Sequence, residues 1–370
     1  VRDWVDWIRE RRSADAQSQP PLDQLALTVS SLELYGLTVN NSRLRLAPRE
    51  QGWQVKVNSD ELDAALGVPP EYRMDGDQPL ELTVNRADLQ IGEGSAQAAP
   101  GDLPIANVDL RNLRINGTDF GRWAFALRPG AQGVVFQDLD GRWRKTDFHG
   151  RLNWTATPAG QSSHFVGRVT ADRLHRALKA WGLDAVIESK DARSVVDVRW
   201  PGSPVEADPD ALNGHASVDI GECRIPETSR GASALRVLGI LNVGSLSRRL
   251  RLDFSDLYKK GLTCDRISGD FQLEAPRVTT DNLVIESPSA EFRISGELNM
   301  EAETLDHRMD VTLPLSSNLY AGCLAGPAAC AGIFVFDRLW GSSLEKMTTL
   351  SYRVTGSWRD PKVRELGASD

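Results

Sequence analysis

Residues 264–300 read CDRISGDFQLEAPRVTTDNLVIESPSAEFRISGELNM, and this stretch decides the fold. Two segments of it, Ile267–Ala275 and Ala290–Met300, alternate apolar and polar residues. Successive side chains of a β-strand point to opposite faces, whereas a helix does not produce a period of two. The stretch therefore predicts neighbouring antiparallel strands that are apolar on one side only.

The same alternation recurs along most of the chain after Leu22 and ends with the segment Leu350–Trp358. Helical spacing of apolar residues is less frequent. It predicts short helices over residues 1–12, 59–66, 171–182 and 233–250. In the second of these, Ser59 or Asp60 is the expected N-cap, and Gly67 is the expected end.

We therefore expect a mostly β protein, an elongated twisted antiparallel sheet curled into an open hydrophobic groove, with a few short helices. A closed barrel or a sandwich would also bury one-sided strands, and periodicity alone does not separate these folds. The expected parts are an N-terminal helix and linker, a repeated β-groove segment, a C-terminal β-groove that contains a helical insertion, and a tail. Their ranges are 1–21, 22–232, 233–363 with the insertion at 316–348, and 364–370.

Composition excludes some classes of protein. The chain has 370 residues, of which 41% are hydrophobic and 25% charged, and its net charge is -8. A nucleic-acid partner is not expected, because binding phosphates requires clustered Lys and Arg. The chain begins with Val1, so we interpret it as a fragment of a longer protein. Its longest uncharged run, 311–336, contains Pro314 and Pro327, which disfavour a membrane-spanning helix.

No motif indicates catalysis. The five histidines lie in five separate segments without metal-ligand spacing, and no nucleophile elbow or phosphate-binding loop is present. Carboxylates on the predicted strands belong to the polar faces, which favours a solvated role. We therefore expect neither an enzyme nor a metal or cofactor site.

Three segments carry a resemblance to a known family. They read LRVLGILNVGSLSRRLRLDFSDLYKKGLTCDRISGDFQL, then VTTDNLVIESPSAEFRISGELNMEAETLDHRMDVTLPLSSNL, and finally SYRVTGSWRDPKV, all between Leu235 and Val363. Together they resemble the C-terminal part of the YhdP group of AsmA-like proteins, which are large envelope proteins of Gram-negative bacteria. Cys264 stands where an aromatic residue is expected in this group.

The resemblance implies a periplasmic part of a phospholipid transport bridge between the inner and outer membranes, with the full-length parent anchored in the inner membrane. Its partners would be phospholipids and the two membrane surfaces; the lipid headgroup and any protein partners are not indicated. The alternatives are a structural or assembly scaffold of the envelope and a carbohydrate-binding β protein. The residues expected to contact lipid are Phe271, Leu273, Ile285, Phe292, Ile294, Leu298, Val311 and Val354.

Two further hypotheses concern the uncharged run. Cys323 and Cys330 are close enough in sequence to form a disulfide in an oxidising compartment, and the alternative is a pair of buried thiols. Cys223 and Cys264 can meet only if their strands are neighbours. The apolar residues that follow suggest a lid or a membrane contact, or else a plug of the sheet's core. They are Ile333, Phe334, Phe336, Leu339 and Trp340.

Overall fold

A computed structural model describes residues 24–34, 37–70, 72–73, 76–90, 100, 103–183, 185, 187–225, 262–288, 290–312, 349–358 and 360–366. The chain divides into two compact units. Unit 1 comprises Val1–Ala98 and Pro104–Asp119, and unit 2 comprises Ala99–Leu103 and Phe120–Asp370. The predicted helices over residues 1–12 and 233–250 lie outside the described residues.

Unit 1 is a sheet in which each strand pairs with the next one along the chain. Its strands are β1 (Leu25–Leu34), β2 (Leu37–Arg49), β3 (Gly52–Asn58), β4 (Leu62–Val68), β5 (Leu80–Leu89) and β6 (Ala106–Ile115). The pairs from β1 to β5 are antiparallel, whereas β5 and β6 are parallel. A small core of Ala64, Val84 and Ala87 lies where β4 meets β5.

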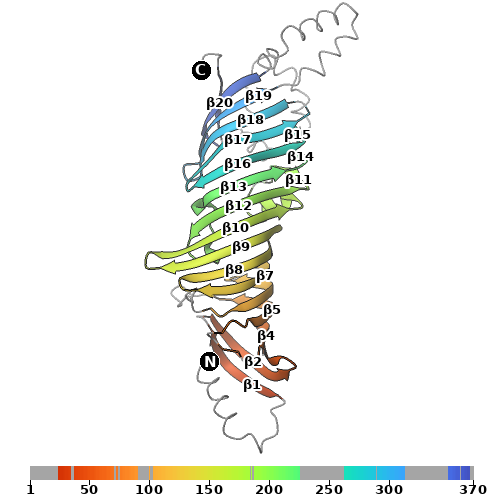
Figure 1. The fold of residues 1–370 in the computed structure, drawn as a ribbon. Coiled ribbons are helices and arrows are strands. Elements are labelled where there is room, and N and C mark those ends of the chain that lie inside the picture. Colours follow the sequence, from red (N-terminus) through yellow and green to blue (C-terminus); the bar gives the residue numbers. More distant parts are fainter. Residues whose placement is uncertain are drawn as a thin grey trace, which may run out of the picture. The chain divides into compact units, whose positions relative to one another are not determined.

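Unit 2 contains a longer, twisted antiparallel sheet, whose successive strands lie side by side in Figure 1. The strands of this sheet are β7 (Thr118–Gly130), β8 (Gly133–Trp143), β9 (Thr146–Thr157), β10 (Gly160–Ala171), β12 (Ala192–Pro201), β13 (Asn213–Ile220), β16 (Arg266–Glu274), β17 (Arg277–Ser287), β18 (Ala290–Asn299), β19 (Thr304–Thr312), β20 (Thr349–Ser357) and β21 (Lys362–Glu365). Each pairs antiparallel with its neighbours in this order.

Within its described residues, unit 2 also contains a second, smaller sheet and three short helices. The small sheet has three strands, β11 (Glu188–Ser189), β14 (Cys223–Ile225) and β15 (Leu262–Cys264). The α-helix is α2 (Leu174–Ala180), and the 3₁₀ turns are η2 (Pro204–Glu206) and η3 (Pro209–Ala211). The prediction of a mostly β fold with a few short helices is confirmed for the described residues, with the parallel β5–β6 pair as a departure from an all-antiparallel sheet.

The helix predicted over residues 59–66 is wrong. Leu62–Val68 is strand β4, which pairs with both β3 and β5. The Ser59 hydroxyl oxygen does accept hydrogen bonds from the backbone N–H groups of Glu61 and Leu62, at 3.2 and 2.9 Å. A serine makes the same local bonds in a turn as at a helix N-cap, and here it makes them in the turn between β3 and β4.

The alternation predicted for residues 290–300 is confirmed in β18. Phe292 and Ile294 are buried, Leu298 is half-buried, and Arg293 and Glu297 are exposed. The helix predicted over residues 171–182 is confirmed in its centre, as α2.

Gly296 in β18 is required by the sheet, which gives a test of the register. Its φ is +137°, and a Cβ at this position would overlap the backbone carbonyl oxygen of Asp306 on β19. Gly356 in β20 also has a positive φ, +99°, but a Cβ there would meet nothing within 4 Å. The two glycines therefore differ in steric room but share an unfavourable backbone for other residues.

We predict that Gly296→Ala lowers the thermal unfolding temperature clearly more than Gly356→Ala. The change at Gly356 should cost only the backbone strain, about 1–3 kcal/mol, whereas the change at Gly296 also forces β18 away from β19. Calorimetry of the two purified variants measures the difference. Equal losses would show that β18 and β19 are not paired in this register.

Candidate functional site

The candidate site is one face of the unit 2 sheet, here called the apolar face and defined by the side chains that share the side of Ile285, Phe292 and Ile294. The register of the paired strands aligns one residue from each of eight strands in a continuous row across this face. In order of pairing, these strands are β10, β12, β13, β16, β17, β18, β19 and β20. We call it row A, and it consists of Ala171, Ala192, Ile220, Ile267, Ile285, Phe292, Val311 and Leu350. Seven of the eight are buried, and Leu350 is partly buried.

Farther along the same strands, the apolar face is less covered. Two shorter rows run across β12, β13 and β16 and across β16, β17 and β18. Their residues are partly exposed, and we call them the lane: Val196, Ala216 and Phe271, and then Leu273, Val278 and Leu298. Row A and the lane are separated by even numbers of residues along β12, β13, β16 and β18, which places them on one face. On β17 the separation from Val278 to Ile285 is odd, and the register shift between Thr280 and Leu283 compensates for it.

All eight residues expected to contact lipid lie on the apolar face, brought together from β16 to β20. Ile285, Phe292, Ile294, Val311 and Val354 are buried, and Phe271, Leu273 and Leu298 are half-buried. Their role in lipid contact stays a prediction. The sequence analysis did not name Val196, Ala216 or Val278, although the alternation in β12 and β13 was a signal that would have found the first two.

The small sheet covers row A. It is built from extensions of three neighbouring strands, since β11 precedes β12, β14 follows β13, and β15 precedes β16. Its buried residues Cys223, Ile225, Leu262 and Cys264 belong to the same apolar cluster as row A, and β15 lies against β17. The small sheet therefore has one face packed on the apolar face of the main sheet.

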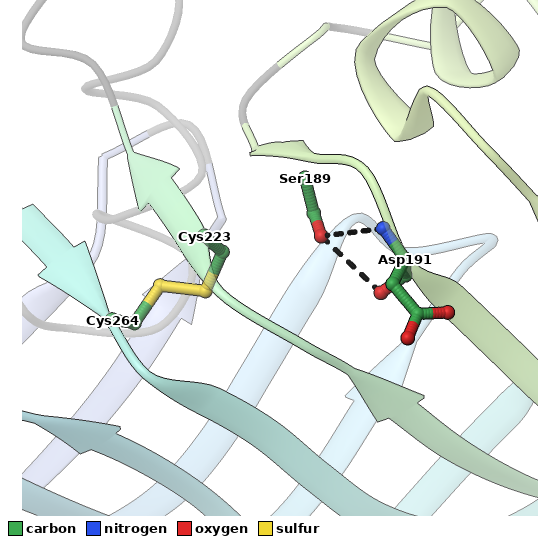
Figure 2. The surroundings of a disulfide bond; sticks show 4 residues. All are labelled: Ser189, Asp191, Cys223 and Cys264. Carbon is green, nitrogen blue, oxygen red and sulfur yellow. Dashed lines mark hydrogen bonds between the residues drawn. A yellow bond between two sulfur atoms is a disulfide. The ribbon is translucent and has the colours of Figure 1, made fainter.

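A disulfide joins Cys223 of β14 to Cys264 of β15, which are directly opposite each other in register (Figure 2). Ser189 of β11 is opposite Cys223 on the other side. Its hydroxyl donates to the carbonyl oxygen of Asp191 and accepts from the Asp191 N–H, both at 3.2 Å, which holds the turn from β11 into β12. All three strands of the small sheet are thus tied at one row.

Helix α2 covers the same side of the apolar face next to the small sheet. Ala177 is buried in the row A cluster, and α2 lies against β11. At its C-terminal end, the Trp181 ring contacts Trp143 and Phe148, with ring centroids 4.8 and 6.4 Å apart. The Trp181 indole N–H donates to the Thr146 hydroxyl oxygen at 3.0 Å, so the helix is attached to the turn between β8 and β9. We call α2 and the small sheet together the wall.

The opposite face of unit 2 carries charge pairs between neighbouring strands. Arg266 donates two hydrogen bonds to Asp219 at 2.9 and 2.8 Å, and Arg353 donates two to Asp306 at 2.9 and 2.7 Å. The arginine hydrogen bonds lower the pKa of each aspartate below its ordinary value of 3.8. These side chains are about half exposed, so they add little to stability and keep this face in water.

The described residues hold no group of three or more His, Cys, Asp or Glu side chains that would bind a metal ion. Within the same ranges, no helix has both the length and the apolar character needed to cross a membrane. The proposed Cys323–Cys330 disulfide and the lid residues Ile333, Phe334, Phe336, Leu339 and Trp340 lie outside the described residues.

We predict that replacing both Cys223 and Cys264 by serine lowers the free energy of unfolding of unit 2. The disulfide closes a loop between residues 41 positions apart, so its loss should cost about 2–4 kcal/mol through the greater freedom of the unfolded chain. Chemical denaturation of wild type and variant measures this. Peptide mapping without reductant is the control, and recovery of Cys223 and Cys264 as alkylated thiols from native wild type would contradict the pairing.

We also predict a specific acid dependence for the Asp219–Arg266 pair. Because the pKa of Asp219 is lower in the folded state, the pair stabilises the fold above pH 3.8 and loses this effect as pH falls through the folded value. The difference in unfolding temperature between wild type and Asp219→Asn should be constant at neutral pH and shrink below pH 3.8. The exposed Asp281→Asn serves as the charge-matched control. A difference that grows on acidification would refute the pairing.

Two comparisons with known proteins find a similarity to this chain. The family model described as "YhdP protein" matches residues 1–363. The Intermembrane phospholipid transporter YhdP of Escherichia coli (strain K12) is 23% identical over 215 residues, which are 58% of this chain and 17% of that protein. The chain thus spans less than a fifth of the length of this relative, and no solved structure matches it. Since the family match covers nearly the whole sequence, well beyond the resembling region 235–363, the chain belongs to the YhdP family.

Proposed function

We propose that the chain is part of a periplasmic bridge that carries phospholipids between the inner and outer membranes, with acyl chains on the apolar face of unit 2. The observation that carries this proposal is the contrast between the two faces. One holds apolar rows across successive strands, and the other holds exposed charge pairs such as Asp219–Arg266 and Asp306–Arg353. The name of the Escherichia coli relative supports the choice of phospholipid as cargo.

Physical chemistry supports acyl chains as the ligand. Each methylene group that leaves water for an apolar surface gains roughly 0.8 kcal/mol, so a long chain binds without specific polar contacts. A headgroup would remain in water. Such binding needs no enzyme chemistry, and the proposal assigns none to the chain.

The disulfide supports a location in the envelope. Disulfides persist in oxidising compartments such as the bacterial periplasm and are rare in the cytosol. The pairing of Cys223 with Cys264 is therefore what a periplasmic segment would have. Anchorage of the parent protein in the inner membrane, and contact with both membrane surfaces, belong to the same proposal.

We predict that Leu298→Asp reduces the phospholipid recovered with the purified chain at least five-fold, whereas Arg293→Asp leaves it unchanged. Both variants place an aspartate on β18, but Leu298 is on the apolar face and Arg293 on the opposite one. A carboxylate on an acyl path is costly to desolvate. Mass spectrometry of organic extracts gives the lipid content, and the unfolding temperature shows whether each variant is folded.

A packed envelope scaffold is the alternative to transport. It predicts that wild type yields no phospholipid on extraction and that Leu298→Asp affects only stability. That result would reject the proposed function.

A further inference from the structure

The burial of the apolar face changes sharply along single strands of unit 2. On β12, Ala192 of row A is 8% exposed, whereas Val196 of the lane, on the same face, is only partly buried. On β18, Phe292 of row A is 4% exposed, and Leu298 of the lane is again only partly buried. The apolar face therefore has a covered side at row A and a more accessible side at the lane, beyond which Val198 and Trp200 of β12 are buried again.

The covered side is fixed by bonds that a mobile lid would not have. The turns that lead from the main sheet into the small sheet are held to it, because the Gly221 N–H donates to the Asp191 carbonyl at 2.8 Å and the Asp265 N–H donates to the Glu286 carbonyl at 2.8 Å. The Cys223–Cys264 disulfide then locks β14 to β15. The wall is thus a permanent part of the fold, and acyl chains cannot reach row A without displacing it.

The accessible side forms a path of the right size. The lane crosses five adjacent strands, β12, β13, β16, β17 and β18, which at about 4.8 Å per strand is roughly 19 Å. One leaflet of a bilayer's hydrocarbon core is about 15 Å thick, so the lane is at least as long as the distance that an acyl chain spans in a membrane. The lane also lies where two apolar clusters of unit 2 meet, since Phe271 packs on one and Leu273 and Val196 pack on the other.

We infer that phospholipid acyl chains occupy only the lane, and that the disulfide-bonded wall excludes them from row A. This rests on the proposed function and deepens it. It assigns ligand contact to Val196, Ala216, Phe271, Leu273, Val278 and Leu298. Of the eight residues expected to contact lipid, Ile285, Phe292 and Val311 become structural, because they belong to row A, which shares one buried apolar cluster with the wall.

The first test compares positions on the same strand and the same face. A photo-crosslinking amino acid is placed at 196 or 192 on β12, and at 298 or 292 on β18, in the full chain mixed with vesicles of phosphatidylethanolamine and phosphatidylglycerol. We expect lipid adducts at 196 and 298 and less than a tenth as many at 192 and 292. Equal adducts at all four positions would show that the wall does not exclude acyl chains from row A, but would leave the proposed function intact. No adducts at any position would instead contradict the proposed function.

A second test does not depend on whether the buried positions tolerate substitution. Ala216 is a small, partly exposed residue in the middle of the lane, and its neighbour His215 is exposed on the opposite face. Ala216→Trp should block the lane and lower the lipid recovered at least five-fold with an unchanged unfolding temperature, whereas His215→Trp should have no effect. Unchanged lipid content in a folded Ala216→Trp protein would show that acyl chains do not occupy the lane.

Discussion

Backbone hydrogen bonding between neighbouring strands is the constraint on which the rest of the structure depends. It aligns one residue per strand into rows and assigns alternate residues to opposite faces. In unit 2 the same register that places Ile267, Ile285 and Phe292 in a single apolar row also places Arg266 and Arg353 beside aspartates on the other face. One-sidedness is therefore a property of the whole sheet, set by pairing, and each strand contributes only its alternation.

A sheet of this kind must cover or solvate its apolar side, and unit 2 does both. The three neighbouring strands β12, β13 and β16 continue past the edge of the main sheet, and their extensions fold back over it. Because those extensions are too short for a stable sheet of their own, the disulfide and the hydrogen bonds at Gly221 and Asp265 hold them in place. The lane lies beyond these extensions and stays partly accessible, whereas Val198 and Trp200, farther along β12, are buried in another apolar cluster.

Sequence predicts the local part of this arrangement and misses the part that depends on distant contacts. The alternation of apolar and polar residues was enough to place Phe271, Leu273 and Leu298 on one face, because it is a property of each strand alone. It did not distinguish Leu298 from Phe292, since only Phe292 is buried in the apolar cluster that the small sheet joins. The pairing of Cys223 with Cys264 depends on β14 and β15 being neighbours across 41 positions. The helix predicted after Ser59 was wrong because the serine hydroxyl makes the same hydrogen bonds in a turn as at the start of a helix.

The division of the apolar face bears on how a ligand could move as well as bind. Row A is held between the main sheet and the wall, where close packing leaves room for one arrangement only. The lane offers instead a series of similar partly exposed apolar side chains at a regular spacing of about 4.8 Å. An acyl chain that advances by one strand loses contact with one such residue and gains an equivalent one, so its burial changes little during the step. The same repeated geometry then gives both strong binding overall and small barriers between neighbouring positions. A deep closed pocket would give strong binding but not small barriers.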